Sequence, residues 1–542
     1  MGIAIHNVEL TVLILVVLVA LLAVFAEKLK TPYPIILVLG GLVLSFIRVV
    51  PHVSLNPTFV FLVILPPLVY ASSLKTPWRE FHANLSIISM LGLGLVGFTV
   101  AGVAVFARFV IPGFGWRSGA ALGAVMSTTD VIAVAAIASR VGLPESLLSI
   151  IEGESLINDA TGLLALQFTT AMVVSGVIPS FGEGLRQLVW LMLGGIAAGL
   201  LIGWLVSRFD RLLFRKFPGA SDLQILVSLA TPYFAYLLGE SLHASGVLAT
   251  VACGVYVGSN SSETLSSRAR LDAHAVWNVL EFSLNGLVFI VIGLQLPAIL
   301  DGIRPNHGHG ALDWPRMLTE AALVCGIVIV LRLLWIFPGA YIARWLRLHL
   351  QDQHSPKPKT KELLVMAWSG MRGVLTLAAA LSLPVYTDQG GQFPHREEII
   401  FLAFAVILVT LVGQGLTLPA MIRKLGVAES ETALDEGREA RREMLRFVLS
   451  TLHGIDTSQD EMEARAVDQL IKLYDQQLQG LSHDSEKQDD ALLGRKYREV
   501  AAQIRAAQRH ELLRLRQEGK FRESTLRGME RELDLMELRW ED

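Results

Sequence analysis

The stretch that decides the fold is an apolar run, residues 120–139, with polar groups at its centre. It reads AALGAVMSTTDVIAVAAIAS, and three hydroxyl side chains and an acid, STTD at 127–130, lie near its middle. Ser, Thr and Asp side chains compete with the backbone for hydrogen bonds, so this run is expected to interrupt a helix. An interrupted helix exposes carbonyl oxygens and half-helix ends that can hold ions inside a membrane. The alternative is that the hydroxyls bond back to their own helix and Asp130 faces a neighbouring span.

A second polar segment follows closely, residues 153–162, which read GESLINDATG. On a helix, Ser155 and Asp159 share one stripe, because residues four apart lie on the same face. Glu154 and Asn158 have the same spacing and form a second stripe. The first face can bind a cation through the Asp159 carboxylate and the Ser155 hydroxyl, and the second can hold a structural pair. The alternative is that Asp159 is permanently paired with a basic residue.

The rest of the chain has the composition of a membrane protein with many spans. Of its 542 residues, 52% are apolar and 18% are charged, whereas about a quarter of the residues of a soluble domain are charged. The apolar residues gather into runs of roughly 18 to 25, the length that crosses a hydrocarbon core. Hydropathy and breaker residues predict about thirteen spans. Their approximate ranges are 8–26, 34–50, 57–74, 83–110, 117–140, 147–177, 185–207, 222–239, 243–259, 274–300, 317–346, 360–384 and 397–422.

Lys and Arg in the short loops predict the orientation. With the N-terminus outside, the inside and outside loops hold roughly sixteen against seven of these residues, as the positive-inside rule requires. An odd number of spans then places the C-terminus in the cytoplasm, and we expect the chain in the cell's inner membrane. After Arg423 the composition changes to Glu, Arg, Gln and Lys with apolar residues at helical spacing. We expect a transmembrane domain over 1–425 and a charged, helical cytoplasmic domain over 426–542, which is either regulatory, a dimer contact or a solvated tail.

Ionisable side chains inside the spans are the candidates for function, because a charge at mid-membrane is costly. These candidates are Asp130, Glu152, Glu154, Asp159, Glu281, Arg332 and Arg372. Arg372 lies between two glycines in SGMRG, residues 369–373, a composition that permits a second interrupted helix. A buried guanidinium needs a buried acid, so we expect a structural ion pair between Arg372 and Glu154. Arg332 has no partner that the sequence identifies, and Glu281 is expected to reach the membrane interface.

Three motifs, in matching order and spacing, resemble those of monovalent cation–proton antiporters, the group that contains bacterial and animal sodium/proton exchangers. GESLINDATG resembles their Asn-Asp helix, STTD their Thr-Asp motif, and SGMRG their Gly-x-Arg-Gly motif. The similarity extends over about residues 8–422. It implies an all-α polytopic fold of thirteen helices with two inverted repeats of six, in which the fifth and twelfth spans are interrupted and cross. It also implies a homodimer.

The resemblance also implies roles for individual residues. Asp159 would be the carboxylate that carries the ion, with Asn158 as its neighbour, and Glu154 would pair with Arg372. The predicted cation-binding residues would be Asp159, Asp130, Thr129, Ser155 and Asn158, and the first four of them would hold Na⁺ directly. The Asn-Asp form is associated in this family with electroneutral exchange.

The sequence departs from the family at two positions. Ala71, in ILPPLVYASSLK at 64–75, stands where the family often has an acid in the third span. Val131 replaces the usual Pro after the Thr-Asp motif. The first departure leaves the choice of cation open, and the second bears on the shape of the crossing.

We therefore expect a secondary antiporter that exchanges Na⁺, with Li⁺ or K⁺ as alternatives, for H⁺ and serves pH homeostasis. Desolvation disfavours a charged carboxylate, so Asp159 can hold a proton or a cation in turn, but not both at once. A potassium/proton exchanger and a cation channel with acids along a continuous pore are the competing hypotheses. The chain has no His-Glu-x-x-His motif and no evident Ser/His dyad, so we do not expect an enzyme. Membrane lipid is an expected partner, whereas nucleic acid and cofactors other than the transported ions are not.

Overall fold

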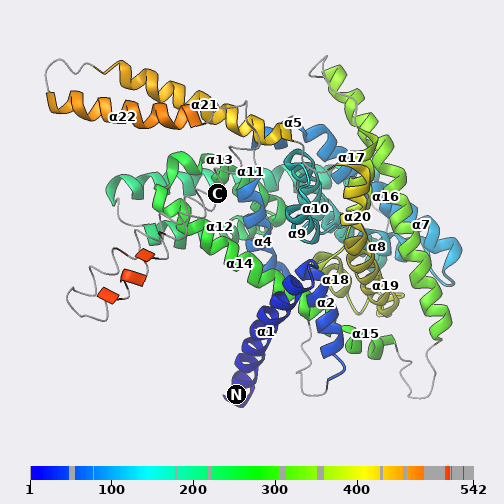
Figure 1. The fold of residues 1–542 in the computed structure, drawn as a ribbon. Helices are drawn as coiled ribbons and strands as arrows, with labels where there is room; N and C mark the ends of the chain where they lie inside the picture. Colours follow the sequence, from blue (N-terminus) through cyan, green and yellow to red (C-terminus); the bar gives the residue numbers. More distant parts are fainter. Residues whose placement is uncertain are drawn as a thin grey trace. The chain divides into compact units, whose positions relative to one another are not determined.

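In the computed structural model, the regular elements of the described residues are all helices, and within these residues no extended strand forms (Figure 1). The described residues are 2–47, 55–76, 78–176, 180–217, 221–303, 313–350, 359–427, 431–455 and 461–480, with 504, 507, 508, 510–512, 514, 515 and 529. The predicted all-helical class is therefore confirmed for this part of the chain. Most of the tail after Gly480 lies outside the described residues.

The helices follow one another along the chain with short connections, and three of them contain a π-helical turn, labelled η. In order they are α1 (Gly2–Lys28), α2 (Tyr33–Leu44), α3 (Pro57–Phe59), η1 (Val60–Ile64), α4 (Leu65–Lys75), α5 (Trp78–Ala83), α6 (Leu85–Ser89), η2 (Met90–Gly94), α7 (Leu95–Val110), α8 (Trp116–Val125), α9 (Ile132–Val141), α10 (Glu145–Ser175), α11 (Phe181–Lys216), α12 (Ser221–Ser241), α13 (Gly246–Thr264), α14 (Ser267–Leu294), α15 (Leu296–Ile303), α16 (Trp314–Leu350), α17 (Thr360–Trp368), α18 (Val374–Leu381), α19 (Arg396–Leu408), η3 (Val409–Gln414), α20 (Gly415–Leu425), α21 (Glu431–His453) and α22 (Glu461–Gly480).

Several helices have the length and surface of membrane spans. By length and hydropathy, 7 helical segments of the described residues can cross a bilayer, namely Leu10–Lys28, Pro57–Lys75, Leu85–Val110, Gly182–Leu213, Ser267–Ile303, Trp314–His349 and Arg396–Leu425. Large apolar side chains such as Leu13 and Leu193 are 61% and 62% exposed, as suits a surface in contact with lipid. The number of spans and the two inverted repeats stay predictions.

Two helices are interrupted where the sequence predicts it. α8 ends at Val125 and α9 begins at Ile132, so the STTD run lies in a gap between them. α17 ends at Trp368 and α18 begins at Val374, so the Arg372 motif lies in a second gap. Both predicted interruptions are confirmed.

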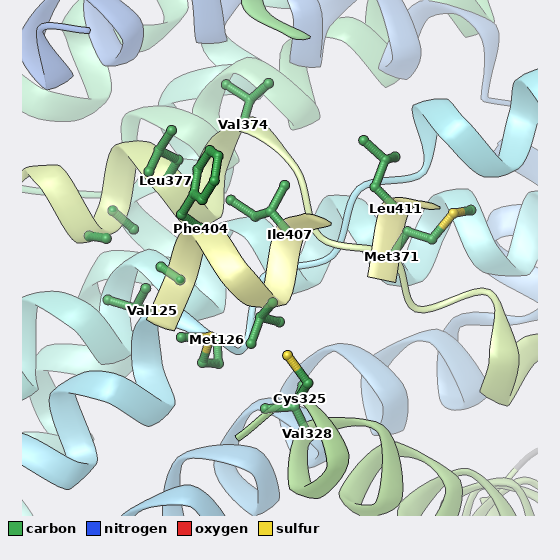
Figure 2. Packing of buried hydrophobic residues seen from close by; sticks show 14 of the residues in the cluster. Val125, Met126, Cys325, Val328, Met371, Val374, Leu377, Phe404, Ile407 and Leu411 are labelled. Carbon is green, nitrogen blue, oxygen red and sulfur yellow. The ribbon is translucent and has the colours of Figure 1, made fainter. Parts of the chain in front are cut away.

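The apolar core of residues 1–429, called here the membrane unit, surrounds these two breaks. Figure 2 shows apolar side chains from α8, α16, the segment around α18, and α19 meeting there. The labelled residues are Val125, Met126, Cys325, Val328, Met371, Val374, Leu377, Phe404, Ile407 and Leu411. Because this packing keeps water away, a polar or charged group near the breaks is costly unless it has a specific partner.

The chain divides into two compact units, Met1–Glu429 and Ser430–Asp542. In the second unit, α21 and α22 pack against each other. Leu445 and Leu449, which recur at helical spacing in α21, are buried. The charged segment after the membrane unit is therefore helical over its described residues.

His395 joins the loop before α8 to the start of α19. Its ring stacks on Phe114 with 4.4 Å between the ring centroids. Nδ1 lies 2.7 Å from a Glu398 carboxylate oxygen, and Nε2 lies 3.0 Å from the Gly113 carbonyl oxygen. Both neighbours are acceptors, so only the doubly protonated imidazolium can donate to both. The bond to Glu398 accordingly raises the pKa of His395 above its ordinary value.

We predict that His395 stabilises the protein mainly at low pH. A group whose pKa rises on folding contributes fully below its unfolded pKa, about 6.5 for histidine, and loses its contribution as the pH passes the raised value. His395→Gln should therefore lower the melting temperature more at about pH 6 than at about pH 9. Thermal unfolding of the purified protein measures this, with the exposed His82→Gln as control. An equal loss at both pH values would contradict the protonated link.

Candidate cation-binding site

At the first break, only one of the two carboxylate oxygens of Asp130 accepts a hydrogen bond. After α8 ends, the Ser127 hydroxyl donates back to the Ala124 carbonyl at 2.7 Å and closes the helix end. The Asp130 Oδ1 atom accepts from the Ile132 backbone N–H at 2.8 Å, and so satisfies a donor at the start of α9. The second oxygen, Oδ2, is buried and accepts no hydrogen bond. One oxygen of this acid therefore fixes the break, and the other remains available.

The second break lies directly against the first. The Asp130 backbone N–H donates to the Met371 carbonyl at 2.8 Å, across the two gaps. The Thr128 and Thr376 hydroxyls are 2.9 Å apart and hydrogen-bonded. Gly373 is required for this approach, because a Cβ atom at that position would collide with the Asp130 carboxylate. The two interrupted helices are therefore joined at their breaks by hydrogen bonds.

Helix α10 supplies the remaining polar groups. Its Ser155 hydroxyl donates to the Thr129 carbonyl at 2.8 Å, and its Asn158 amide donates to the Thr129 hydroxyl at 3.3 Å. Asp159 is only 9% exposed, and its Oδ1 atom has no hydrogen-bond partner. Because a buried oxygen without a partner is costly, this oxygen can accept a hydrogen bond or a positive charge.

A small cavity joins these groups. Its volume is about 80 Å³, enough for a monovalent cation with a few waters. Its polar lining residues are Ser72, Thr128, Thr129, Asp130, Ser155, Asp159 and Thr376. Carboxylate, hydroxyl and carbonyl oxygens are the ligands that hard cations take in proteins.

Four of the five residues predicted to bind the cation line this one cavity: Asp159, Asp130, Thr129 and Ser155. Asn158 lies beside it instead, where its amide donates to both Thr129 and Glu154. Sequence reasoning missed Thr376. The available signal was a hydroxyl residue a few positions after the second break, in an otherwise apolar run.

The predicted ion pair between Glu154 and Arg372 is wrong. Glu154 is instead held by Arg332 of α16 through two parallel hydrogen bonds of 2.5 and 2.9 Å, and both side chains are almost completely buried. Arg332 also donates to the Met366 carbonyl at 2.9 Å. This fork satisfies both carboxylate oxygens of Glu154. The partner of Arg332, which the sequence left open, is thus identified.

Arg372 is satisfied by backbone carbonyls instead of an acid. Its guanidinium donates to the Met126 carbonyl at 3.3 Å and to the Gly370 carbonyl. Its backbone N–H donates to the Thr410 hydroxyl at 3.1 Å. Met126 closes the C-terminal end of α8, where the helix dipole carries partial negative charge and favours a cation. Arg372 therefore links the ends of the two interrupted helices.

The other candidates lie away from the cavity. Glu281 pairs with Lys75 at 2.7 Å and is partly exposed, consistent with a position near the interface. Glu152 is half-buried and does not line the cavity. Ala71, at the position of the missing acid, is buried and lines a different cavity, while its neighbour Ser72 lines this one.

Comparisons with known proteins identify the family of the chain. The family model for the sodium/hydrogen exchanger, transmembrane, matches residues 13–424. The chain is 33% identical over 541 residues to a protein named as an uncharacterised Na⁺/H⁺ exchanger in Mycobacterium tuberculosis, covering 97% of this chain and 96% of that protein. It is 30% identical over 537 residues to the sodium, potassium, lithium and rubidium/H⁺ antiporter of Bacillus subtilis, covering 98% of this chain and 78% of that protein.

A solved structure has a similar fold. The sodium proton antiporter MjNhaP1 from Methanocaldococcus jannaschii superposes with a TM-score of 0.61 at 19% identity. The match covers 79% of this chain and 100% of that chain. At this identity the likeness concerns the fold alone.

We predict that the buried pair of Glu154 and Arg332 is needed for folding. Removing one partner leaves an unpaired buried ion, so Arg332→Leu should destabilise the protein by about 3–5 kcal/mol. In the double variant Glu154→Leu with Arg332→Leu, the free energy of unfolding should fall by less than the sum of the decreases in the two single variants. Reversible unfolding in mixed micelles measures the three values.

A matched control lies on the same helix. Arg316 pairs with Glu320 at 2.8 Å but is half exposed, so Arg316→Gln should cost less than about 1 kcal/mol. If Arg316→Gln and Arg332→Leu lowered the free energy of unfolding equally, the buried pair would contribute no more to stability than the exposed pair.

We also predict that Gly373→Ala disables the cavity. The added methyl group must displace the Asp130 carboxylate, and a displacement of about 1 Å at a reacting group can cost on the order of a hundredfold in rate. Cation-dependent proton movement in vesicles measures the loss. Gly97→Ala, at a helix position where a Cβ atom meets nothing within 4 Å, is the control. A Gly373→Ala protein that works at the normal rate would refute the close approach.

Proposed function

Because the chain belongs to the transmembrane sodium/hydrogen exchanger family, we propose that it exchanges a monovalent cation for protons across the membrane. One observation carries the proposal. Two carboxylates, Asp130 and Asp159, each have a buried oxygen without a partner, and both line one cavity at the breaks of two helices. A site of this kind can hold positive charge in either of two forms, a proton or a metal ion.

Competition at Asp159 couples the two ions. The charged carboxylate is disfavoured away from water, so Asp159 is neutralised either by a proton or by a cation, but not by both together. The Ser155 hydroxyl donates its hydrogen to the Thr129 carbonyl, which leaves its oxygen lone pairs for the cation. Asp130, held at Oδ1 by the start of α9, offers Oδ2 as a second charged ligand.

The transport motion is alternating access. We infer thirteen spans in two inverted repeats, with the interrupted pairs α8–α9 and α17–α18 as equivalent members of the repeats. The bundle that carries them would move against the rest of the membrane unit around the fixed site. Slow movement of the empty, charged site would prevent either ion from leaking without the other.

Sodium is the first choice of cation. The site offers hard oxygen ligands and few of them, which suits a small alkali ion. Li⁺ and K⁺ are the alternatives, and the Bacillus subtilis relative is named for exchange of sodium, potassium, lithium and rubidium. The exchange would be electroneutral: Asn158, beside Asp159, is neutral and is occupied with Thr129 and Glu154.

The wider assignment follows from the same proposal. The protein would lie in the inner membrane as a homodimer, with its N-terminus outside and its C-terminus in the cytoplasm. The charged helical tail after the membrane unit would be regulatory. Export of cations against protons would serve pH homeostasis.

We predict that Asp159→Asn abolishes exchange while the protein still folds and reaches the membrane. The amide can neither release a proton nor neutralise a cation, so both halves of the cycle fail. The measurement is dye-monitored proton movement in everted vesicles on adding Na⁺, K⁺ or Li⁺ in turn. Asp222→Asn, outside the cavity, is the control.

The same assay tests the ion choice and the class of transporter. The largest signal should follow Na⁺. Exchange at the normal rate in the Asp159→Asn protein would remove this residue from the mechanism. Cation currents that persist without a proton gradient would indicate a channel.

A further inference from the structure

A second, larger cavity lies apart from the site of Asp159. It has a volume of about 700 Å³ and is lined by α4, α11, α12, α13 and α14. It lies towards the Lys75 end of α4 and the Ser267 end of α14. The orientation given under the proposed function places these ends at the cytoplasmic side of the membrane, so the inference rests on that orientation.

The cavity contains the buried carboxylate of Asp210, and the ion pairs found between described residues include none that neutralises it. Asp210 of α11 is 2% exposed, and its Oδ1 atom has no hydrogen-bond partner. The Gln224 amide, which donates to both the Asp210 and Thr264 carbonyls, ties this residue to the C-terminal end of α13. An acid in this state calls for a positively charged or hydrogen-donating ligand.

The cavity wall beside Asp210 is aromatic. The Tyr70 and Trp277 rings lie 5.3 Å apart, and both line the cavity. The Trp277 N–H donates to the Ser228 hydroxyl at 2.9 Å, whereas the Tyr70 hydroxyl is completely buried and without a partner. Aromatic faces attract cations, and the free hydroxyl can accept a hydrogen from one. The group that fits this end of the cavity is an amine with N–H donors.

The same cavity has a cationic wall. Arg270 of α14 lines it, and its guanidinium donates to the Leu265 carbonyl at 3.0 Å, just after the end of α13. His274, one turn further along α14, also lines the cavity. The ion pairs found among the described residues do not include one between Arg270 and Asp210, although both lie near the end of α13. A ligand that carries both a positive and a negative group would therefore complement both side chains.

The flanks of the cavity are suited to lipid. α11 and α14 both line it, and each packs against α12. Leu271 and Val279 of α14 are 70% and 67% exposed, and Phe209 of α11, next to Asp210, is 46% exposed. These apolar side chains are suited to acyl chains beside the opening.

We propose that this cavity binds the headgroup of a phospholipid that carries a primary amine beside its phosphate, as phosphatidylethanolamine does. The ammonium group lies between Asp210 and the Tyr70–Trp277 pair, and the phosphate lies against Arg270 and His274. A phosphate alone would face the Asp210 carboxylate, which repels it. A metal ion would find one carboxylate and three basic side chains, those of Lys75, Arg270 and His274, which is a poor ligand set.

The test compares lipid headgroups on the purified full-length protein by native mass spectrometry. The probes are short-chain phosphatidylethanolamine, phosphatidylglycerol and phosphatidylcholine, together with free phosphoethanolamine. Phosphatidylethanolamine should bind about tenfold more tightly than the other lipids, because only it donates charged N–H bonds to Asp210. Equal binding of phosphatidylglycerol, or equally tight binding of free phosphoethanolamine, would overturn the proposal.

Variants locate the two charges. Asp210→Asn should remove the preference for the amine, and Arg270→Gln should weaken binding of every phospholipid. Asp272→Asn and Arg268→Gln, from an exposed ion pair on α14, are the matched controls. If Asp210→Asn fails to fold, Tyr70→Phe replaces it and should reduce the same preference.

An unchanged preference in both Asp210→Asn and Tyr70→Phe would refute the amine site. Binding is measured without an ion gradient, so its outcome is independent of whether the chain exchanges cations.

Discussion

A carboxylate kept away from water must find positive charge or hydrogen donors, and this constraint governs the centre of the membrane unit. Three acids meet it in three ways. Glu154 is held permanently by the Arg332 fork. Asp130 is half satisfied by the backbone at the start of α9. Asp159 keeps an oxygen without any partner. Permanent pairing suits a structural role, whereas the unpartnered oxygen of Asp159 suits reversible binding of an ion.

The interrupted helices exist in this fold because the breaks supply what a continuous helix cannot. Each break frees backbone groups, and several of these are used at once: the Met371 carbonyl by the Asp130 N–H, the Met126 carbonyl by Arg372, and the Thr129 carbonyl by Ser155. Such backbone is tolerated at membrane depth only when it is buried in protein or lines a cavity. Here both conditions hold, since apolar side chains surround the breaks (Figure 2).

Much of this arrangement follows from local sequence. The STTD run predicts a break because its side chains compete with helical hydrogen bonds, and the spacing of Ser155 and Asp159 places both on one face of α10. The partner of Glu154 did not follow, because two arginines lie in apolar runs and chain order does not say which helix is the neighbour. Arg372 donates to carbonyls at a helix end, and this arrangement could not be predicted without knowing that the two breaks lie side by side. The Asp210 cavity is lined by residues of five helices, so no single segment of the sequence predicts it.

The most direct test of the account is the number of protons released when the cation binds. Calorimetric titration of the purified protein with Na⁺, in buffers of different ionisation enthalpy, measures it. If one carboxylate is neutralised by either ion in turn, binding should release about one proton per cation at a pH where Asp159 is protonated, and the affinity should fall as the pH is lowered. Cation binding without proton release, and with an affinity independent of pH, would contradict the account.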